Sequence, residues 1–130
     1  MTETITPGLQ LMLVETFELV RDFDEYEKAV RAFCLRIEQD GLSGVRLMQH
    51  YVSRQRNEAF VILIFSNANV FENHLSFISK LDEMSPFINT VKLKEIKAFG
   101  SMNKEQVSLL NNAKFQFDLV DEHVVGFVRH

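Results

Sequence analysis

Few residues in this sequence have the type and spacing that catalysis or metal binding requires. The histidines are His50, His74, His123 and His130. They form neither an HxH nor an HxxxH pair, so the sequence predicts no metal site, which would need several ligands at short, fixed spacing. The single cysteine, Cys34, falls among the core positions of a helical pattern, which favours a buried structural thiol over a nucleophile. No nucleophile elbow, P-loop or dinucleotide fingerprint is present, and we expect no bound cofactor.

His74 is the strongest candidate for chemistry. It lies at the flank of an apolar helical stripe, from which an imidazole near neutrality could take a proton from a phenol or an enol. The alternative is a partly exposed helix histidine with no such role. We predict His74 as a catalytic base that faces a cavity between its helix and a sheet.

Three further polar residues, Glu15, His50 and Tyr51, are set among apolar neighbours on predicted strands. We predict Glu15 and Tyr51 as additional catalytic groups and His50 as a ligand-binding group. A cross-strand or dimer-interface pair is the alternative for Glu15 and Tyr51. An apolar pocket with a few such groups would suit a small aromatic or fatty ligand. Its other predicted ligand-binding residues are Phe17, Phe65, Phe71 and Ile78.

The chain must position these residues around a central strand. Residues 60–65 are six consecutive apolar residues, rich in β-branched and aromatic side chains and bounded by polar turns. Such a short run predicts a strand that is apolar on both faces, although a buried helix segment shares this pattern. Further strands are predicted over residues 9–20, 45–54 and 91–99, the last with lysines that suggest an exposed or edge position.

Periodic apolar stripes predict the helices. The first covers residues 22–40, with Asp22 or Asp24 as its N-cap and Gly41 ending it in a left-handed conformation. A second covers residues 68–85, with Asn69 as its N-cap and Pro86 closing it. A short third helix over residues 103–112 precedes a final extended segment in residues 115–120 and 124–128.

This order of elements, β-α-β-β-α-β followed by α-β, predicts one α+β domain over residues 1–130. The core, residues 9–99, follows the ferredoxin-like plan, an antiparallel sheet with its helices on one face, and residues 100–130 form a C-terminal extension. Because the central strand is also apolar on the other face, a second copy of the sheet is the simplest cover. We therefore predict a homodimer, a dimeric α+β barrel, which the C-terminal strand could tie by crossing to the partner.

Composition excludes several classes of partner. The net charge is −4 and no cluster of lysine and arginine stands out, so nucleic-acid binding is disfavoured. No apolar run approaches the ~20 residues of a membrane helix, and no secretory signal precedes the domain. One cysteine among 130 residues fits a reducing, cytoplasmic setting.

The segment FVILIFSNANVFENHLSF, residues 60–77, resembles the dimeric α+β barrel superfamily and its antibiotic-biosynthesis-monooxygenase branch. Members of that branch often have an aromatic-rich third strand, a short polar turn and a helix with a histidine one turn in. The resemblance covers residues 9–99. It implies a cofactor-independent monooxygenase that acts on a small hydrophobic or phenolic substrate. The alternative is a non-catalytic protein that binds an apolar, lipid-like or aromatic ligand.

Overall fold

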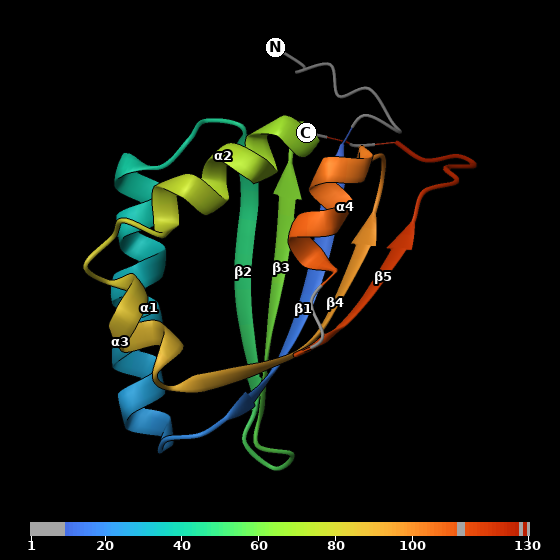
Figure 1. Ribbon diagram of the computed structural model, residues 1–130. Helices are drawn as coiled ribbons and strands as arrows, with labels where there is room; N and C mark the ends of the chain where they lie inside the picture. The colour runs from blue at the N-terminus through green and yellow to red at the C-terminus, as the bar shows by residue number, and fades with distance from the viewer. Residues whose placement is uncertain (1–9, 112–113, 128, 130) are drawn as a thin grey trace.

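The structure, a computed structural model, describes residues 10–111, 114–127 and 129 of the chain (Figure 1). The strands of this part are β1 (Leu11–Leu19), β2 (Val45–Ser53), β3 (Glu58–Phe65), β4 (Val91–Phe99) and β5 (Gln116–Val120). Its helices are α1 (Phe23–Asp40), α2 (Ala68–Ile78), α3 (Met84–Ile88) and α4 (Lys104–Leu110).

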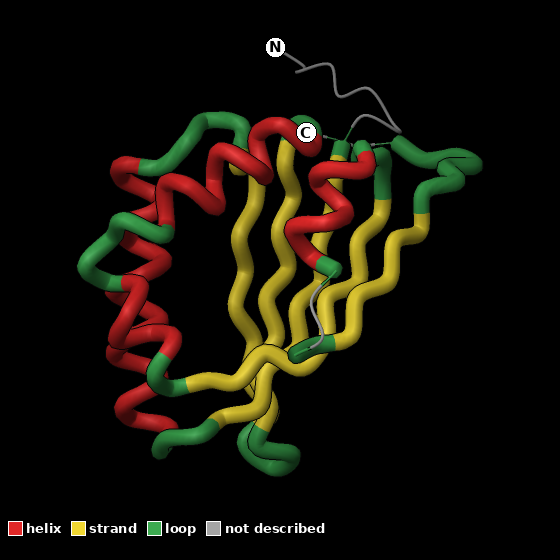
Figure 2. Tube along the Cα trace, in the orientation of Figure 1, coloured by secondary structure: helices red, strands yellow, loops and turns green. Residues whose placement is uncertain are grey.

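All five strands belong to one sheet with the order β2-β3-β1-β4-β5. The three pairings among β2, β3, β1 and β4 are antiparallel, whereas β5 runs parallel to β4. Figure 2 shows the strands side by side with the helices gathered on one side of them. The order and directions of β1 to β4 are those of the ferredoxin-like plan, so the predicted α+β fold is confirmed.

The core lies between the helices and the face of the sheet that we call the inner face. On β1 this face carries Leu11, Leu13 and Phe17, which are all buried. Phe65 of β3 and Phe71 of α2 are also fully buried and meet edge to face, with ring centroids 5.4 Å apart. Burying a side chain of this size contributes about 1.5–3 kcal/mol, so these residues fix the helices over the sheet.

The opposite, outer face of the sheet is apolar in its central part. On β3, burial alternates: Val61 and its inner-face neighbours are buried, whereas Phe60, Ile62 and Ile64 are only partly buried. In the part of the chain that the structure describes, no helix lies against this outer face (Figure 2). A strand that is apolar on both faces is therefore covered on one face only within a single chain.

Helix α1 begins as its sequence predicts and ends differently. The side chain of Asp22 accepts a hydrogen bond from the backbone N–H of Glu25, which makes Asp22 the N-cap. Gly41 follows the helix, but its φ is −78°, so the predicted left-handed conformation is wrong. Glycine is needed there for space, because a Cβ at this position would lie 2.4 Å from the carbonyl oxygen of Ile37.

The predicted single helix over residues 68–85 is two helices, α2 and α3. The N-cap of α2 is Asn67, whose side chain accepts from the N–H of Val70 at 3.0 Å, and not Asn69 as predicted. Pro86 lies inside α3 and does not close a helix as predicted. The first turn of a helix tolerates proline because its N–H groups have no intrahelical partner.

The C-terminal extension adds one helix and one strand to the sheet's β4 edge. Residues Glu95 to Phe99 of β4 pair with β5, so the predicted edge position holds only for the first half of β4. The N-cap of helix α4 is Asn103, which forms a capping box with Gln106. Residues 121–127 form no strand and carry three highly exposed apolar side chains. These are Val124, Val125 and Phe127, at 86%, 84% and 79% exposure.

Candidate functional site

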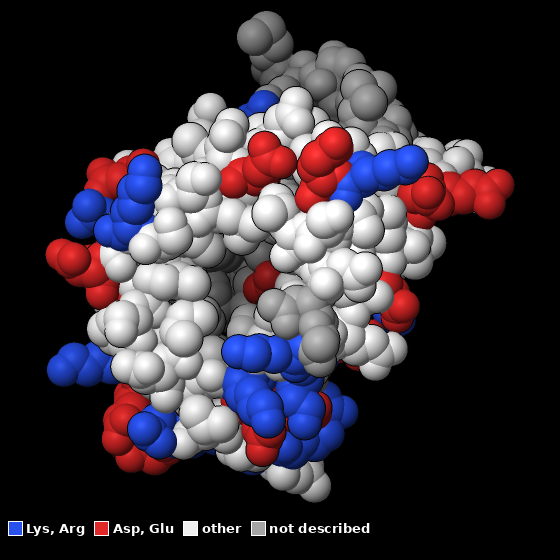
Figure 3. Space-filling view, viewed as in Figure 1, with Lys and Arg blue, Asp and Glu red and all other residues white. Residues whose placement is uncertain are grey.

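A pocket of about 390 Å³ lies between the inner face of the sheet and the helices. Strands β1 to β4 and all four helices contribute to its walls, and nearly all of the lining side chains are apolar. Figure 3 shows a hollow on this side of the molecule that is bordered largely by uncharged residues, with an acidic group visible in its depth. A volume of this size matches that of a small-molecule site.

Three titratable side chains belong to this lining: Glu15 of β1, His50 of β2 and His74 of α2. Glu15 and His50 both pair with Val61, one from each neighbouring strand. Because directly paired residues share a face, the carboxyl and the imidazole flank Val61 on the inner face. Adjacent strands are about 4.8 Å apart, which puts the two backbone positions on the order of 10 Å from each other.

His74 reaches the pocket from the helical side. Its side chain is only 3% exposed, and its ring centroid lies 5.4 Å from that of Phe65. Among the residues that the structure describes, its buried Nδ1 atom has no hydrogen-bond partner. Burial lowers the pKa of His74 to about 4, so the imidazole is neutral at physiological pH and can offer one acceptor and one donor.

His50, like His74, has an imidazole whose pKa is lowered by burial. Its ring lies edge-on to that of Phe87, with centroids 6.2 Å apart. Its Nε2 atom is buried and has no hydrogen-bond partner in the described part of the chain. Burial lowers its pKa to about 4 as well. The pocket therefore contains two neutral imidazoles whose hydrogen-bonding capacity the described residues leave unused.

Glu15 has the pKa best suited to proton transfer. Desolvation by burial raises the pKa of its carboxyl from 4.5 to about 7. Within the described residues, the carboxyl has neither a hydrogen bond nor an ion pair. A carboxylate in apolar surroundings is costly, so the proton is held more tightly than in water. Near neutral pH, Glu15 exists in both protonation states.

The structure brings seven of the eight predicted site residues to one pocket. They are Glu15, Phe17, His50, Phe65, Phe71, His74 and Ile78. The eighth, Tyr51, is not brought there. It pairs with Phe60 on the outer face and is 58% exposed. The period of two along β2 sends neighbouring residues to opposite faces, which separates Tyr51 from His50.

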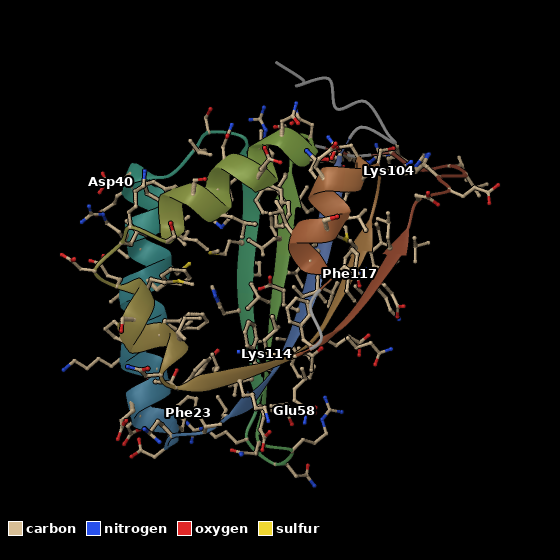
Figure 4. The ribbon with its side chains drawn as sticks, in the orientation of Figure 1. Phe23, Asp40, Glu58, Lys104, Lys114 and Phe117 are labelled. Carbon is tan, nitrogen blue, oxygen red and sulfur yellow. The ribbon has the colours of Figure 1, made fainter. Side chains whose placement is uncertain are left out.

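Part of the pocket wall comes from the C-terminal extension, which the sequence did not associate with the site. Leu109 and Leu110 of α4 line the pocket, as does Phe115 just before β5. Figure 4 marks Lys104 and Lys114 on either side of this wall and Phe117 on the α4 side of β5. The apolar positions of α4 indicate that one side of the helix is buried. They do not indicate which part of the protein it packs against, so its place in the pocket wall could not be predicted from the sequence.

In the described part of the chain, no group of three or more histidine, cysteine, aspartate or glutamate side chains is arranged to hold a metal ion. No helix in the described part of the chain is both long and apolar enough to cross a membrane.

Comparison with known proteins identifies the fold. No family model matches the sequence, and no curated protein does. MupZ from Pseudomonas fluorescens matches with a TM-score of 0.63 and 17% identity, over 90% of this chain and 94% of that one. SnoaB, a cofactor-independent oxygenase from Streptomyces nogalater, matches with a TM-score of 0.60 and 12% identity, over 73% and 95%. A proposed antibiotic biosynthesis monooxygenase from Caulobacter crescentus gives 0.59 and 13%, over 74% and 92%.

These likenesses confirm the resemblance found in the sequence at the level of fold. The chain has the α+β fold of the antibiotic-biosynthesis-monooxygenase-like proteins. The MupZ match covers more of the chain than the ferredoxin-like core alone could supply, so part of it lies outside that core.

Proposed function

We propose that this protein is a cofactor-independent oxygenase that binds a small hydrophobic phenol in the pocket and removes its acidic proton. One observation carries the proposal: Glu15, an unpartnered carboxyl with a pKa of about 7, lies in an apolar pocket with two neutral imidazoles. A general base works best when its pKa is near the working pH. The fold shared with SnoaB supports the reaction type.

The pKa values favour Glu15 over His74 as the base. A phenol has a pKa of about 10, so transfer to Glu15 spans about 3 units, or roughly 4 kcal/mol. Transfer to His74, with a pKa of about 4, spans about 6 units, or roughly 8 kcal/mol. In this proposal Glu15 takes the proton, while His50 and His74 hydrogen-bond to the ligand's oxygen atoms and orient it.

The reaction needs molecular oxygen as its only co-reactant. Proton removal gives a phenolate, whose electron-rich ring carbon reduces O2 and forms a carbon–oxygen bond. Loss of the ring hydrogen and cleavage of the O–O bond, with return of the proton from the Glu15 carboxyl to the departing oxygen, then give a quinone and water and restore the base. One oxygen atom enters the product, the other leaves as water, and the phenol supplies all of the electrons. The apolar walls limit water around the phenolate and the oxygenated intermediate.

We expect His74→Ala to lower turnover of phenolic substrates about 100-fold or more, because the ligand loses a group that orients it for proton transfer. The measurement is oxygen consumption with a panel of naphthols and anthrols. Glu72→Ala, at an exposed position of the same helix, is the control and should keep full turnover. Unchanged turnover in a folded His74→Ala protein would remove His74 from the mechanism.

Non-catalytic binding of an apolar ligand is the competing function, and the same pocket would serve it. Native mass spectrometry of the undialysed protein separates the two. The oxygenase proposal predicts consumption of O2 with at least one phenol of the panel. A tightly held lipid-like molecule in the purified protein, together with no oxygen consumption by any phenol, would support binding alone.

We also infer that two copies of the chain pair through the outer face of the sheet. The partly buried side chains of β3 on that face, Phe60, Ile62 and Ile64, form one apolar row next to Met12, which is 36% exposed. Monomeric proteins rarely leave a contiguous apolar area of this kind uncovered. The exposed apolar residues at 124–127 could then pack on the partner.

A further inference from the structure

Besides the pairing of β5 with β4, the C-terminal extension is joined to helix α2 by one buried amide, that of Gln106. The side chain is only 2% exposed. Its Oε1 accepts from the backbone N–H of Asn103 at 2.9 Å, while its own backbone N–H donates to Asn103 Oδ1 at 2.8 Å. Its Nε2 donates to Oδ1 of Asn69 at 3.0 Å. One residue therefore completes the cap of α4 and joins α4 to α2.

This link spans two walls of the pocket. Gln106 precedes Leu109 and Leu110, which line the pocket from α4. Asn69 lies in the first turn of α2, the helix that carries Phe71 and His74. Because α2 is capped by Asn67, the side chain of Asn69 is not needed for its own helix end.

The stability of helix α4 depends on tertiary contacts such as the hydrogen bond from Gln106 to Asn69. The helix has only seven residues, and Leu109 is 52% exposed. A helix this short has little stability of its own and persists through tertiary contacts. A buried amide with all of its partners fixes the orientation of neighbouring segments, whereas removal of one partner leaves a costly unsatisfied group.

We propose that Gln106 is a positioning residue of the site: through Asn69 it fixes α2 against the C-terminal wall, and so holds the buried His74 in place within the pocket. This rests on the proposed function only in so far as His74 belongs to the site. The extension is then a functional wall of the pocket. Loss of the link lets α4 and the start of α2 separate, and water reaches the His74 imidazole.

The test is an NMR titration of the histidine rings in Asn69→Ala. Asn69 is exposed, so the substitution removes the acceptor of Gln106 without disturbing the cap of α2. The expected result is a rise of about one unit or more in the pKa of His74, because hydration relieves the desolvation that lowers it. The other titratable groups that line the pocket are Glu15 and His50. His50, on β2, is the internal reference and should keep its lowered pKa.

Hydrogen exchange supplies a second readout. In Asn69→Ala, the backbone amides of α4 should exchange about tenfold faster, since local opening becomes easier. Asn73→Ala, an exposed asparagine of the same helix, is the matched control and should leave both the His74 titration and the exchange of α4 unchanged. Unchanged behaviour of Asn69→Ala, or equal shifts at His74 and His50, would overturn the proposal.

Neither readout uses a substrate, so the two proposals can fail separately. A selective shift at His74 combined with no oxygen consumption by any phenol would refute the oxygenase and leave the positioning role intact. Turnover in the parent protein, together with an unshifted His74 in Asn69→Ala, would refute the positioning role alone.

Discussion

Replacing Glu15 with glutamine is expected to stabilise the protein by about 2–3 kcal/mol near pH 8 while abolishing turnover. The folded-state pKa, about 7, lies above the ordinary value of 4.5. Between these values the folded state keeps a proton that the unfolded state has lost, so stability falls as pH rises through this window. Above about pH 7 the buried charge exerts its full cost, and glutamine removes it.

The measurement is urea unfolding of both proteins near pH 8 and near pH 4. At the lower pH the carboxyl is protonated in both states, so the stabilisation by Glu15→Gln should vanish. His50 and His74 act in the opposite direction, because their lowered pKa values reduce stability as pH falls from 6.5 towards about 4. Both histidines are present in the parent protein and in Glu15→Gln, so their contributions cancel in the difference between the two free energies of unfolding.

Glu72→Gln is the matched control for this experiment. Its side chain is exposed on α2, and the substitution should change stability by less than about 0.5 kcal/mol at either pH. If the stability gained by Glu15→Gln over the parent protein is no larger near pH 8 than near pH 4, the raised pKa of Glu15 is contradicted. The choice of Glu15 as the base would then lose its support.

The placement of the site residues could be predicted where the period of the secondary structure decides it. Alternation along β1 places Glu15 and Phe17 on one face, and the helical spacing of Phe71 and His74 directs both to the core. The bounds of β4, Val91 to Phe99, agree with the sequence for the same reason. Burial of His74 could not be settled from its flank position, because Phe65, on the separate element β3, packs against its ring.

The errors arise where contacts between distant segments decide the structure. Asn67 and Asn69 are both good caps locally, and the bond from Gln106 to Asn69 accompanies the choice of Asn67 as cap. The parallel pairing of β5 with β4 also depends on where α4 packs, which no local pattern states. Local sequence patterns therefore predict the pocket residues on the sheet and on α2, but not the wall that the C-terminal extension supplies.

Substituting Ile62 with glutamate is expected to convert a dimer into a monomer. Ile62 lies in the middle of the apolar row on β3, paired with Val14 on one side and Gln49 on the other. A two-fold interface contains each residue twice, so one substitution introduces two buried carboxylates. At about 2 kcal/mol or more for each, the dissociation constant should rise on the order of 1,000-fold.

Sedimentation at micromolar concentration measures this directly. The parent protein should sediment at twice the 15.1 kDa mass of one chain, and Ile62→Glu at that mass itself. Leu35→Glu introduces the same change at a 53% exposed position of α1 and should remain dimeric. A parent protein that sediments as a monomer would refute the pairing of outer faces. Because Ile62 points away from the pocket, Ile62→Glu should still bind a phenol, which shows that the pocket forms within one chain.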